Sequence, residues 1–168
     1  IHIRDWVLLT PLSIQSFWAF LGGHRSQIDT IRYRSALVDA LTLVLPEQTA
    51  KLKSSTRWML RAVDVKTALQ KRGYPQNIQA ELHLEVQDDL LSKNNNKFIL
   101  SVANGSADVT EGGRGDLKLD IRAFAPLYTS LFSPSQLQMA GKLEATQNAI
   151  IAATQIFAGA SPWMADFF

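Results

Sequence analysis

Residues 57–75 (RWMLRAVDVKTALQKRGYP) combine a strand-like segment, a capped helix and a helix stop in one short stretch. Large apolar and β-branched residues fill 58–63, which predicts a strand. Asp64 follows with a side chain suited to cap a helix N-terminus, and apolar residues recur at helical spacing over 65–71. Gly73 ends that helix. The stretch therefore predicts the opening of a folded domain.

Strands follow this helix. Apolar and polar residues alternate over 80–87, which predicts a strand with one face on the core and one face in water. An Asn-Gly dipeptide at 104–105 separates two more strand-like runs, 98–103 and 106–111, and this dipeptide readily takes the positive φ of a hairpin turn. Another strand is expected over 117–121.

The period becomes helical from Ala123 onward. Ser133 opens a second helical run, and Thr146 can cap a last helix with one apolar stripe along it. Strands followed by helices predict an α+β fold, in which helices cover one face of an antiparallel sheet.

Residues 1–45 have a different pattern, of α/β type. It predicts strands over 1–9 and 28–34, a helix that starts at Thr10-Pro11, and a short helix over 37–45. A segment of this size buries too little surface to be stable alone, so we expect it to be part of a longer chain. The polar residues 46–56 predict a linker.

Composition excludes several classes of protein. The 168 residues carry a net charge of only +2, so we expect no nucleic-acid partner. No apolar run is long enough to span a bilayer, so we expect no membrane association. There is no cysteine, which rules out disulfides and thiolate catalysis and is typical of a cytoplasmic protein.

Local motifs give no sign of an enzyme site. The histidines lack metal-ligand spacing, and the glycine cluster at 112–115 lacks the spacing of a phosphate-binding loop. The carboxylate pairs Asp88-Asp89 and Glu81 with Glu85 are interpreted as solvated surface.

The stretch 58–75 resembles the start of the sterol-carrier-protein-like domain that closes three-domain GCN5-related N-acetyltransferases of the enhanced intracellular survival type. The resemblance continues through 116–141 (DLKLDIRAFAPLYTSLFSPSQLQMAG), 143–146 (LEAT) and 162–168 (PWMADFF). It implies that 1–45 is the C-terminal half of a central acetyltransferase-like domain, that 46–56 is a linker, and that 57–168 is the sterol-carrier-like domain.

The terminal stretch PWMADFF is unusually apolar for a chain end, so we expect it to dock against other residues. By resemblance to the family, the main-chain carboxylate of Phe168 would be the general base that deprotonates the acceptor amine. Asp166 and Phe167 would line the acceptor site. Some members of the family have Glu where Phe167 stands, so this departure leaves the identity of the acceptor open.

The resemblance also implies partners. Acetyl-CoA would be bound by a missing N-terminal domain, together with the tyrosine that acts as general acid, so the fragment alone should be inactive. The rest of the parent chain, an amine acceptor and a homo-oligomer, a hexamer by resemblance, complete this interpretation. Two alternatives remain: a module that binds lipid or sterol, and a purely structural domain for oligomerisation.

Overall fold

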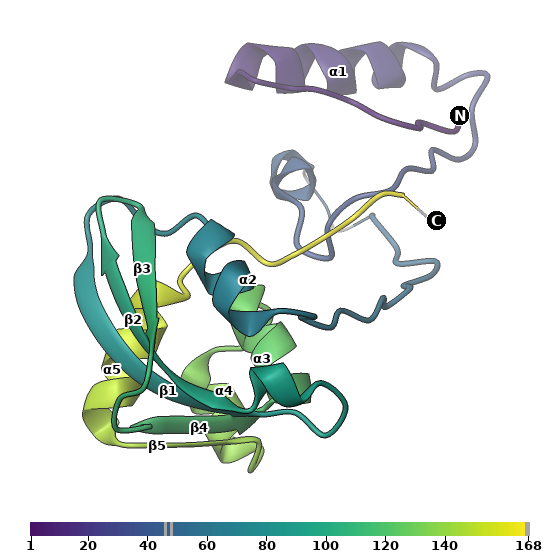
Figure 1. The fold of residues 1–168 in the computed structure, drawn as a ribbon. Coiled ribbons are helices and arrows are strands. Elements are labelled where there is room, and N and C mark those ends of the chain that lie inside the picture. The colour runs from purple at the N-terminus through teal and green to yellow at the C-terminus, as the bar shows by residue number, and fades with distance from the viewer. Residues whose placement is uncertain (46, 48, 167–168) are drawn as a thin grey trace. The chain divides into compact units, whose positions relative to one another are not determined.

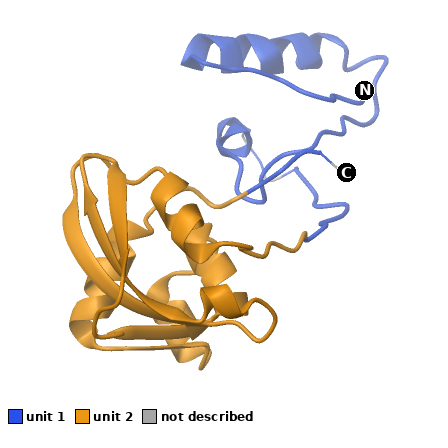
Figure 2. Cartoon of the chain, viewed as in Figure 1, with its two compact units in different colours: residues 1–57, 163–168 blue, residues 58–162 orange. Residues whose placement is uncertain are grey.

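A computed structural model describes residues 1–45, 47 and 49–166. The chain divides into two compact units (Figure 2). Unit 1 comprises residues 1–57 and 163–168, and unit 2 comprises residues 58–162. Each unit is described by itself.

Unit 1 contains the helix α1 (Pro11–Gly23), labelled in Figure 1. Thr10 caps its N-terminus by accepting a hydrogen bond of 3.1 Å from the Ser13 N–H, and Pro11 occupies the first turn as predicted. The short helix expected over 37–45 is a 3-10 turn, η1 (Ala40–Val44).

The two strands expected in unit 1 are not formed. An isolated bridge between His2 and Arg32 is the only strand-like pairing in the described part of 1–9 and 28–34. Aromatic contacts instead hold the two segments to each other and to α1: the Trp6 ring lies 4.7 Å from that of Tyr33 and 5.9 Å from that of Phe17 in α1. A strand needs a continuous row of hydrogen bonds to a neighbouring strand, and the pairing between these segments is limited to this single bridge.

Unit 2 begins with an extended segment and the helix α2 (Val65–Lys71). Asp64 caps α2 as predicted, because its carboxylate accepts a 2.9 Å hydrogen bond from the Thr67 N–H. The strand expected over 58–63 does not form, since this segment has no strand beside it among the described residues.

Within the described residues, five strands form one sheet in the order β3-β2-β1-β4-β5. They are β1 (Gln79–Gln87), β2 (Asn96–Ala103), β3 (Ser106–Glu111), β4 (Leu117–Asp120) and β5 (Leu143–Ala145). A 3-10 turn, η2 (Ser92–Asn94), lies between β1 and β2. The hairpin β2–β3 is confirmed, with Asn104 and Gly105 at φ of 52° and 77°.

The sheet is mixed rather than wholly antiparallel. β1 pairs in parallel with β4, from Leu84 opposite Leu117 to Gln87 opposite Asp120, while the other pairs are antiparallel. The hairpin of β2 and β3 comes between β1 and β4 in the sequence, and β3 lies at one edge of the sheet. The chain therefore crosses back from that edge to place β4 beside β1.

Three helices follow β4 and pack on one face of the sheet (Figure 1). They are α3 (Ile121–Tyr128), α4 (Pro134–Met139) and α5 (Gln147–Ile156). Ser133 caps α4 and Thr146 caps α5, as the sequence predicts. This arrangement confirms the α+β class.

The space between the sheet and these helices is filled by side chains. Apolar residues from every layer are almost completely buried there, among them Leu69, Leu84, Phe98, Phe124, Leu127 and Ile156. Burial of each such side chain stabilises the fold by about 1.5 to 3 kcal/mol.

None of the described helices has both the length and the apolar character needed to cross a bilayer.

Candidate functional site

The candidate site is the terminal segment, which follows α5. Phe157, directly after α5, is 4% exposed and belongs to the core of unit 2. From Trp163 onward the segment belongs to unit 1. Phe167 and Phe168 lie outside the described residues, so their roles stay predictions.

The described end of this segment is accessible. Asp166 is exposed, and the backbone just before it is held within unit 1, because Arg34 Nη1 donates a hydrogen bond of 3.3 Å to the Ala165 carbonyl. Arg34 was not singled out from the sequence, and no local signal identifies it, since the contact spans 131 residues.

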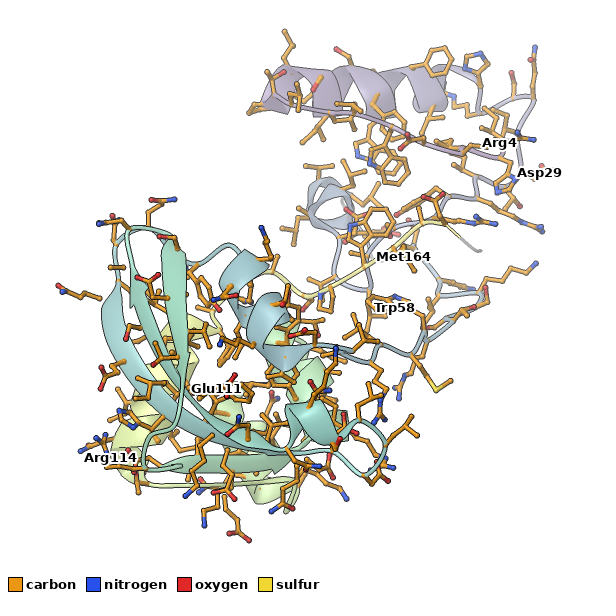
Figure 3. All side chains as sticks on the ribbon, viewed as in Figure 1. Arg4, Asp29, Trp58, Glu111, Arg114 and Met164 are labelled. Atoms are coloured by element: carbon orange, nitrogen blue, oxygen red, sulfur yellow. The ribbon has the colours of Figure 1, made fainter. Side chains whose placement is uncertain are left out.

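The expected docking of the tail is not seen for its first two large side chains. Trp163 is 53% and Met164 38% exposed, and Figure 3 labels Met164 on the terminal segment. The described part of the chain therefore does not supply a full cover for these side chains. These side chains therefore still carry the free-energy cost of contact with water, which was the reason to predict docking.

The outer face of the sheet holds a buried histidine that the alternating pattern placed in water. His83 is only 7% exposed, because the loop after β3 crosses over it (Figure 3 labels Arg114 on this loop). Its Nδ1 accepts a 3.0 Å hydrogen bond from the Arg114 backbone N–H, and this leaves Nε2 to donate to Glu81 Oε1 at 2.8 Å. With both nitrogens engaged, His83 holds the loop and is not available as a base.

The interpretation of Asp88 as a surface carboxylate is wrong. Its side chain is fully buried and ion-paired with Arg61, whereas the side chain of Asp89 is 61% exposed as expected. Asp88 also accepts hydrogen bonds from the backbone N–H groups of Leu90 and Leu91. These contacts fix the loop after β1, a structural role.

Two features of the described chain that resemble binding sites for the diphosphate of a coenzyme A thioester are partly taken up by the chain's own groups. At α1 the Ser13 N–H is already engaged by Thr10, and Pro11 has no N–H to offer. In the glycine cluster, Gly113 and Gly115 lie against His83 and Glu85 and leave no cradle. Nor does the described chain contain a group of acidic, histidine or cysteine residues suited to hold a metal ion.

Two of the hollows on the described surface of unit 2 are open to solvent. One, of about 520 Å³, lies over β1, β2 and β3 near the hairpin turn and has Glu81 and Asp108 in its wall. The other, of about 390 Å³, lies between α3 and α4 and is lined by Phe132 and Leu137. Neither is the enclosed apolar tunnel that a lipid carrier needs.

Unit 2 is a mixed five-stranded sheet with helices on one face. Residues 65–165 match the sterol carrier protein domain, and the chain belongs to that family. Residues 1–62 match the acetyltransferase (GNAT) domain. A comparison with curated proteins gave no match.

Solved structures resemble the whole chain. A GCN5-related N-acetyltransferase from Anabaena variabilis ATCC 29413 is 62% identical, with a TM-score of 0.96. A GCN5-related N-acetyltransferase from Kribbella flavida is 26% identical with a TM-score of 0.86, and Eis1 from Mycobacterium abscessus is 27% identical with a TM-score of 0.76. Each match covers 99% of this chain, which spans 43% of the length of each of those proteins.

Proposed function

We propose that this chain is the C-terminal part of an acetyl-CoA-dependent N-acetyltransferase, and that it supplies the base and part of the acceptor site. The observation that carries this proposal is the match over 99% of the chain to the Anabaena variabilis N-acetyltransferase, at 62% identity. Both units contribute, because an acetyltransferase domain and a sterol carrier protein domain are matched in sequence order. The remainder of the catalytic machinery, including the acetyl-CoA site and the general acid, is assigned to the rest of the parent chain.

In this proposal the main-chain carboxylate of Phe168 takes the proton from the acceptor ammonium, so that the neutral amine can attack. A chain-terminal carboxyl has an ordinary pKa of about 3.3 to 3.7, which is low for a base at neutral pH. To act as a base, this carboxylate needs surroundings that exclude water and so raise its pKa.

Asp166 gives the acceptor site its charge. Its side chain is exposed and follows the Ala165 carbonyl that Arg34 holds. A carboxylate at this place attracts a cationic amine before the proton is removed. The acceptor is therefore proposed to be a primary amine on a small polycation or on a protein lysine.

The filled interior of unit 2 argues against the lipid-carrier alternative. Phe98, Phe124 and Leu127 occupy the space between sheet and helices in which a lipid would lie, and all three are at most 2% exposed. A domain can keep a fold while its original ligand site is lost. Assembly into a homo-oligomer, through either unit, is part of the same proposal.

The test is an assay of the complete gene product that contains this chain. Release of coenzyme A should depend on an amine acceptor, and residues 1–168 alone should neither bind acetyl-CoA nor acetylate amines. Micromolar binding of acetyl-CoA to residues 1–168 in a calorimetric titration would contradict the assignment of the acetyl-CoA site to the rest of the parent chain. Displacement of a fluorescent fatty acid at low micromolar concentration, with no amine-dependent reaction, would favour the carrier instead.

A further inference from the structure

Arg72 connects the ends of two helices in unit 2. Its Nε donates to the carbonyl of Tyr128, the last residue of α3, at 3.0 Å, and its Nη1 donates to the carbonyl of Ile156, the last residue of α5, at 3.3 Å. Carbonyls in the last turn of a helix lack partners within the helix and carry its negative dipole end. One guanidinium thus supplies hydrogen-bond donors and a positive charge to the C-terminal ends of two helices.

Aromatic rings enclose the same guanidinium. Its carbon lies 5.0 Å from the ring centre of Tyr74, 5.3 Å from that of Phe157 and 5.9 Å from that of Tyr128. Burial lowers the pKa of Arg72 from its ordinary value, while Tyr74 and Tyr128 oppose this effect. Because a guanidinium stacked on rings is hard to replace, this site is specific for Arg rather than Lys.

Ser130 extends the contact to the residue that follows α5. Its hydroxyl receives a hydrogen bond of 3.2 Å from Arg72 Nη2 and donates one of 2.8 Å to the Phe157 carbonyl. Ser130 has a φ of 62°, a conformation that residues other than glycine rarely adopt. The strained backbone places the hydroxyl between Arg72 and the first residue of the terminal segment.

Gly159 lies so close to Ser130 that a larger residue there would displace the Ser130 hydroxyl. A Cβ added to Gly159 would lie 2.7 Å from Ser130 Oγ. Arg72, Ser130 and Gly159 therefore form an anchor, named here the tail anchor, at the point where the terminal segment leaves α5.

From these contacts we infer that Arg72 and Ser130 are positioning residues, which fix the start of the terminal segment and thereby the place its carboxylate can reach. This inference rests on the proposed function, which gives Asp166, Phe167 and Phe168 of this segment their roles in the reaction. A base on a loose tail samples a large volume, whereas a tail held at its root has a higher effective concentration at the acceptor.

The decisive variant is Ser130→Gly in the full-length protein. Glycine adopts a φ of 62° without strain, so the change removes the two hydroxyl contacts while the fold of unit 2 is kept. Amide hydrogen exchange in residues 157–166 should rise at least about 10-fold, with no change over β1. The kcat, measured well below the Tm, should fall about 10-fold or more, while the KM for acetyl-CoA stays constant.

Two further changes make the test specific. Gly159→Ala should disturb the tail through its contact with Ser130, and in the double variant with Ser130→Gly its effect should shrink, because the clashing hydroxyl is gone. Arg122→Gln is the matched control: Arg122 pairs with Asp89 on the surface, so its loss should change neither exchange nor kcat. Arg72→Lys keeps the charge but should raise exchange in the tail as Ser130→Gly does.

Unchanged exchange in 157–166 of Ser130→Gly would overturn the inference. Raised exchange with an undiminished kcat would overturn it as well, because the anchor would then have no bearing on the reaction. If the wild-type protein acetylates no amine, the proposed function fails, and the catalytic purpose of the anchor fails with it. The exchange data then still decide whether the anchor exists.

Discussion

Asn94 Nδ2 donates a hydrogen bond of 2.8 Å to Asp88 Oδ2, and both side chains are buried. Asn94 Oδ1 accepts in turn from the Val65 N–H at 3.0 Å, at the first residue of α2. The carboxylate after β1 is thereby connected through one amide side chain to the N-terminus of a helix. Buried polar groups of this kind stabilise a fold only while each has its partner.

Asp88→Asn should destabilise the protein although it keeps the shape of the side chain. The side-chain nitrogen of the new amide would replace an oxygen that accepts hydrogen bonds. It would then face N–H donors of Asn94 or of the Leu90 and Leu91 backbone, with which it cannot form a hydrogen bond. We expect the Tm at pH 7 to fall by roughly 5 to 10 °C. Asp89→Asn is the control, because that side chain is exposed, and its Tm should stay within about 2 °C of the wild type.

The carboxylate of Asp88 should also make the free energy of unfolding depend on pH in acidic solution. Burial alone would raise the pKa of Asp88, but hydrogen bonds from Asn94, Leu91 and Leu90 and the charge of Arg61 outweigh it and lower the pKa from 3.8 to about 2. The folded pKa is the lower one, so the contribution is present above about pH 4 and is lost as the pH falls toward 2. Urea midpoints from pH 7 to 2 should show this slope for the wild type. An equal slope in Asp88→Asn would assign it to other groups.

Tyr74 should give the opposite dependence at alkaline pH. Its hydroxyl donates to the Leu69 carbonyl at 2.6 Å, and burial raises the pKa of this hydroxyl above its ordinary value of 10.0, although Arg72 opposes the shift. The folded pKa is the higher one, so the contribution is complete below pH 10 and is lost as the pH rises above it.

Tyr74→Phe should therefore cost about 1 kcal/mol of unfolding free energy at pH 8, from the lost hydrogen bond. Above pH 10 this difference should shrink, because only the wild type gains free energy in the unfolded state by ionising. Chemical denaturation at pH 8 and 11 measures both values. A difference that is the same at both pH values would mean that Tyr74 ionises equally well in the folded protein.

The loop over His83 allows a matched pair of glycine substitutions. Gly112 and Gly113 have φ of 110° and 100°, so alanine at either position strains the backbone by about 1 to 3 kcal/mol. A Cβ at Gly112 meets nothing, whereas one at Gly113 would lie 2.6 Å from His83 Nδ1 and 2.9 Å from Ile99 Cγ1. Gly113→Ala should thus destabilise the protein by about 1 to 3 kcal/mol more than Gly112→Ala in urea denaturation. Equal losses would show that the loop does not rest on His83.

Local signals in the sequence predicted local structure well. The Asn-Gly turn, the Asp64 cap and the Thr146 cap each depend on a few adjacent residues, and all three occur. Their geometry is decided by side chains that hydrogen-bond within three positions or by a permitted positive φ. Sequence reasoning is reliable at that range.

Long-range contacts decided the cases that the sequence pattern missed. β5 has only three residues and exists because it pairs with β4. Asp88 is paired with Arg61, which lies 27 residues before it in the sequence. The role of Arg72 depends on where α3 and α5 end in space, although near the end of α2 it could be interpreted only as a complement to the helix dipole.

The candidate site was predicted by resemblance more than by physical pattern. Composition marked the terminal segment as unusual, but only the family resemblance gave Phe168 a chemical role. The structure adds the residues that hold the segment, Arg34 near its end and Ser130 at its start. Both act through hydrogen bonds to backbone carbonyls, which leave no trace in the sequence.

The last prediction concerns Phe168, the one residue of this chain proposed to take part directly in proton transfer. In the full-length protein, deletion of Phe168 or addition of a few residues after it moves or removes the carboxylate. The kcat should fall by roughly 10² to 10⁴, the usual contribution of a positioned general base, while the Tm changes little. Phe168→Leu should cost less, because the carboxylate remains and only its apolar setting changes. A full kcat in the extended protein would exclude the carboxylate as the base, and a loss of activity that follows the loss of folded protein would assign the tail a purely structural role.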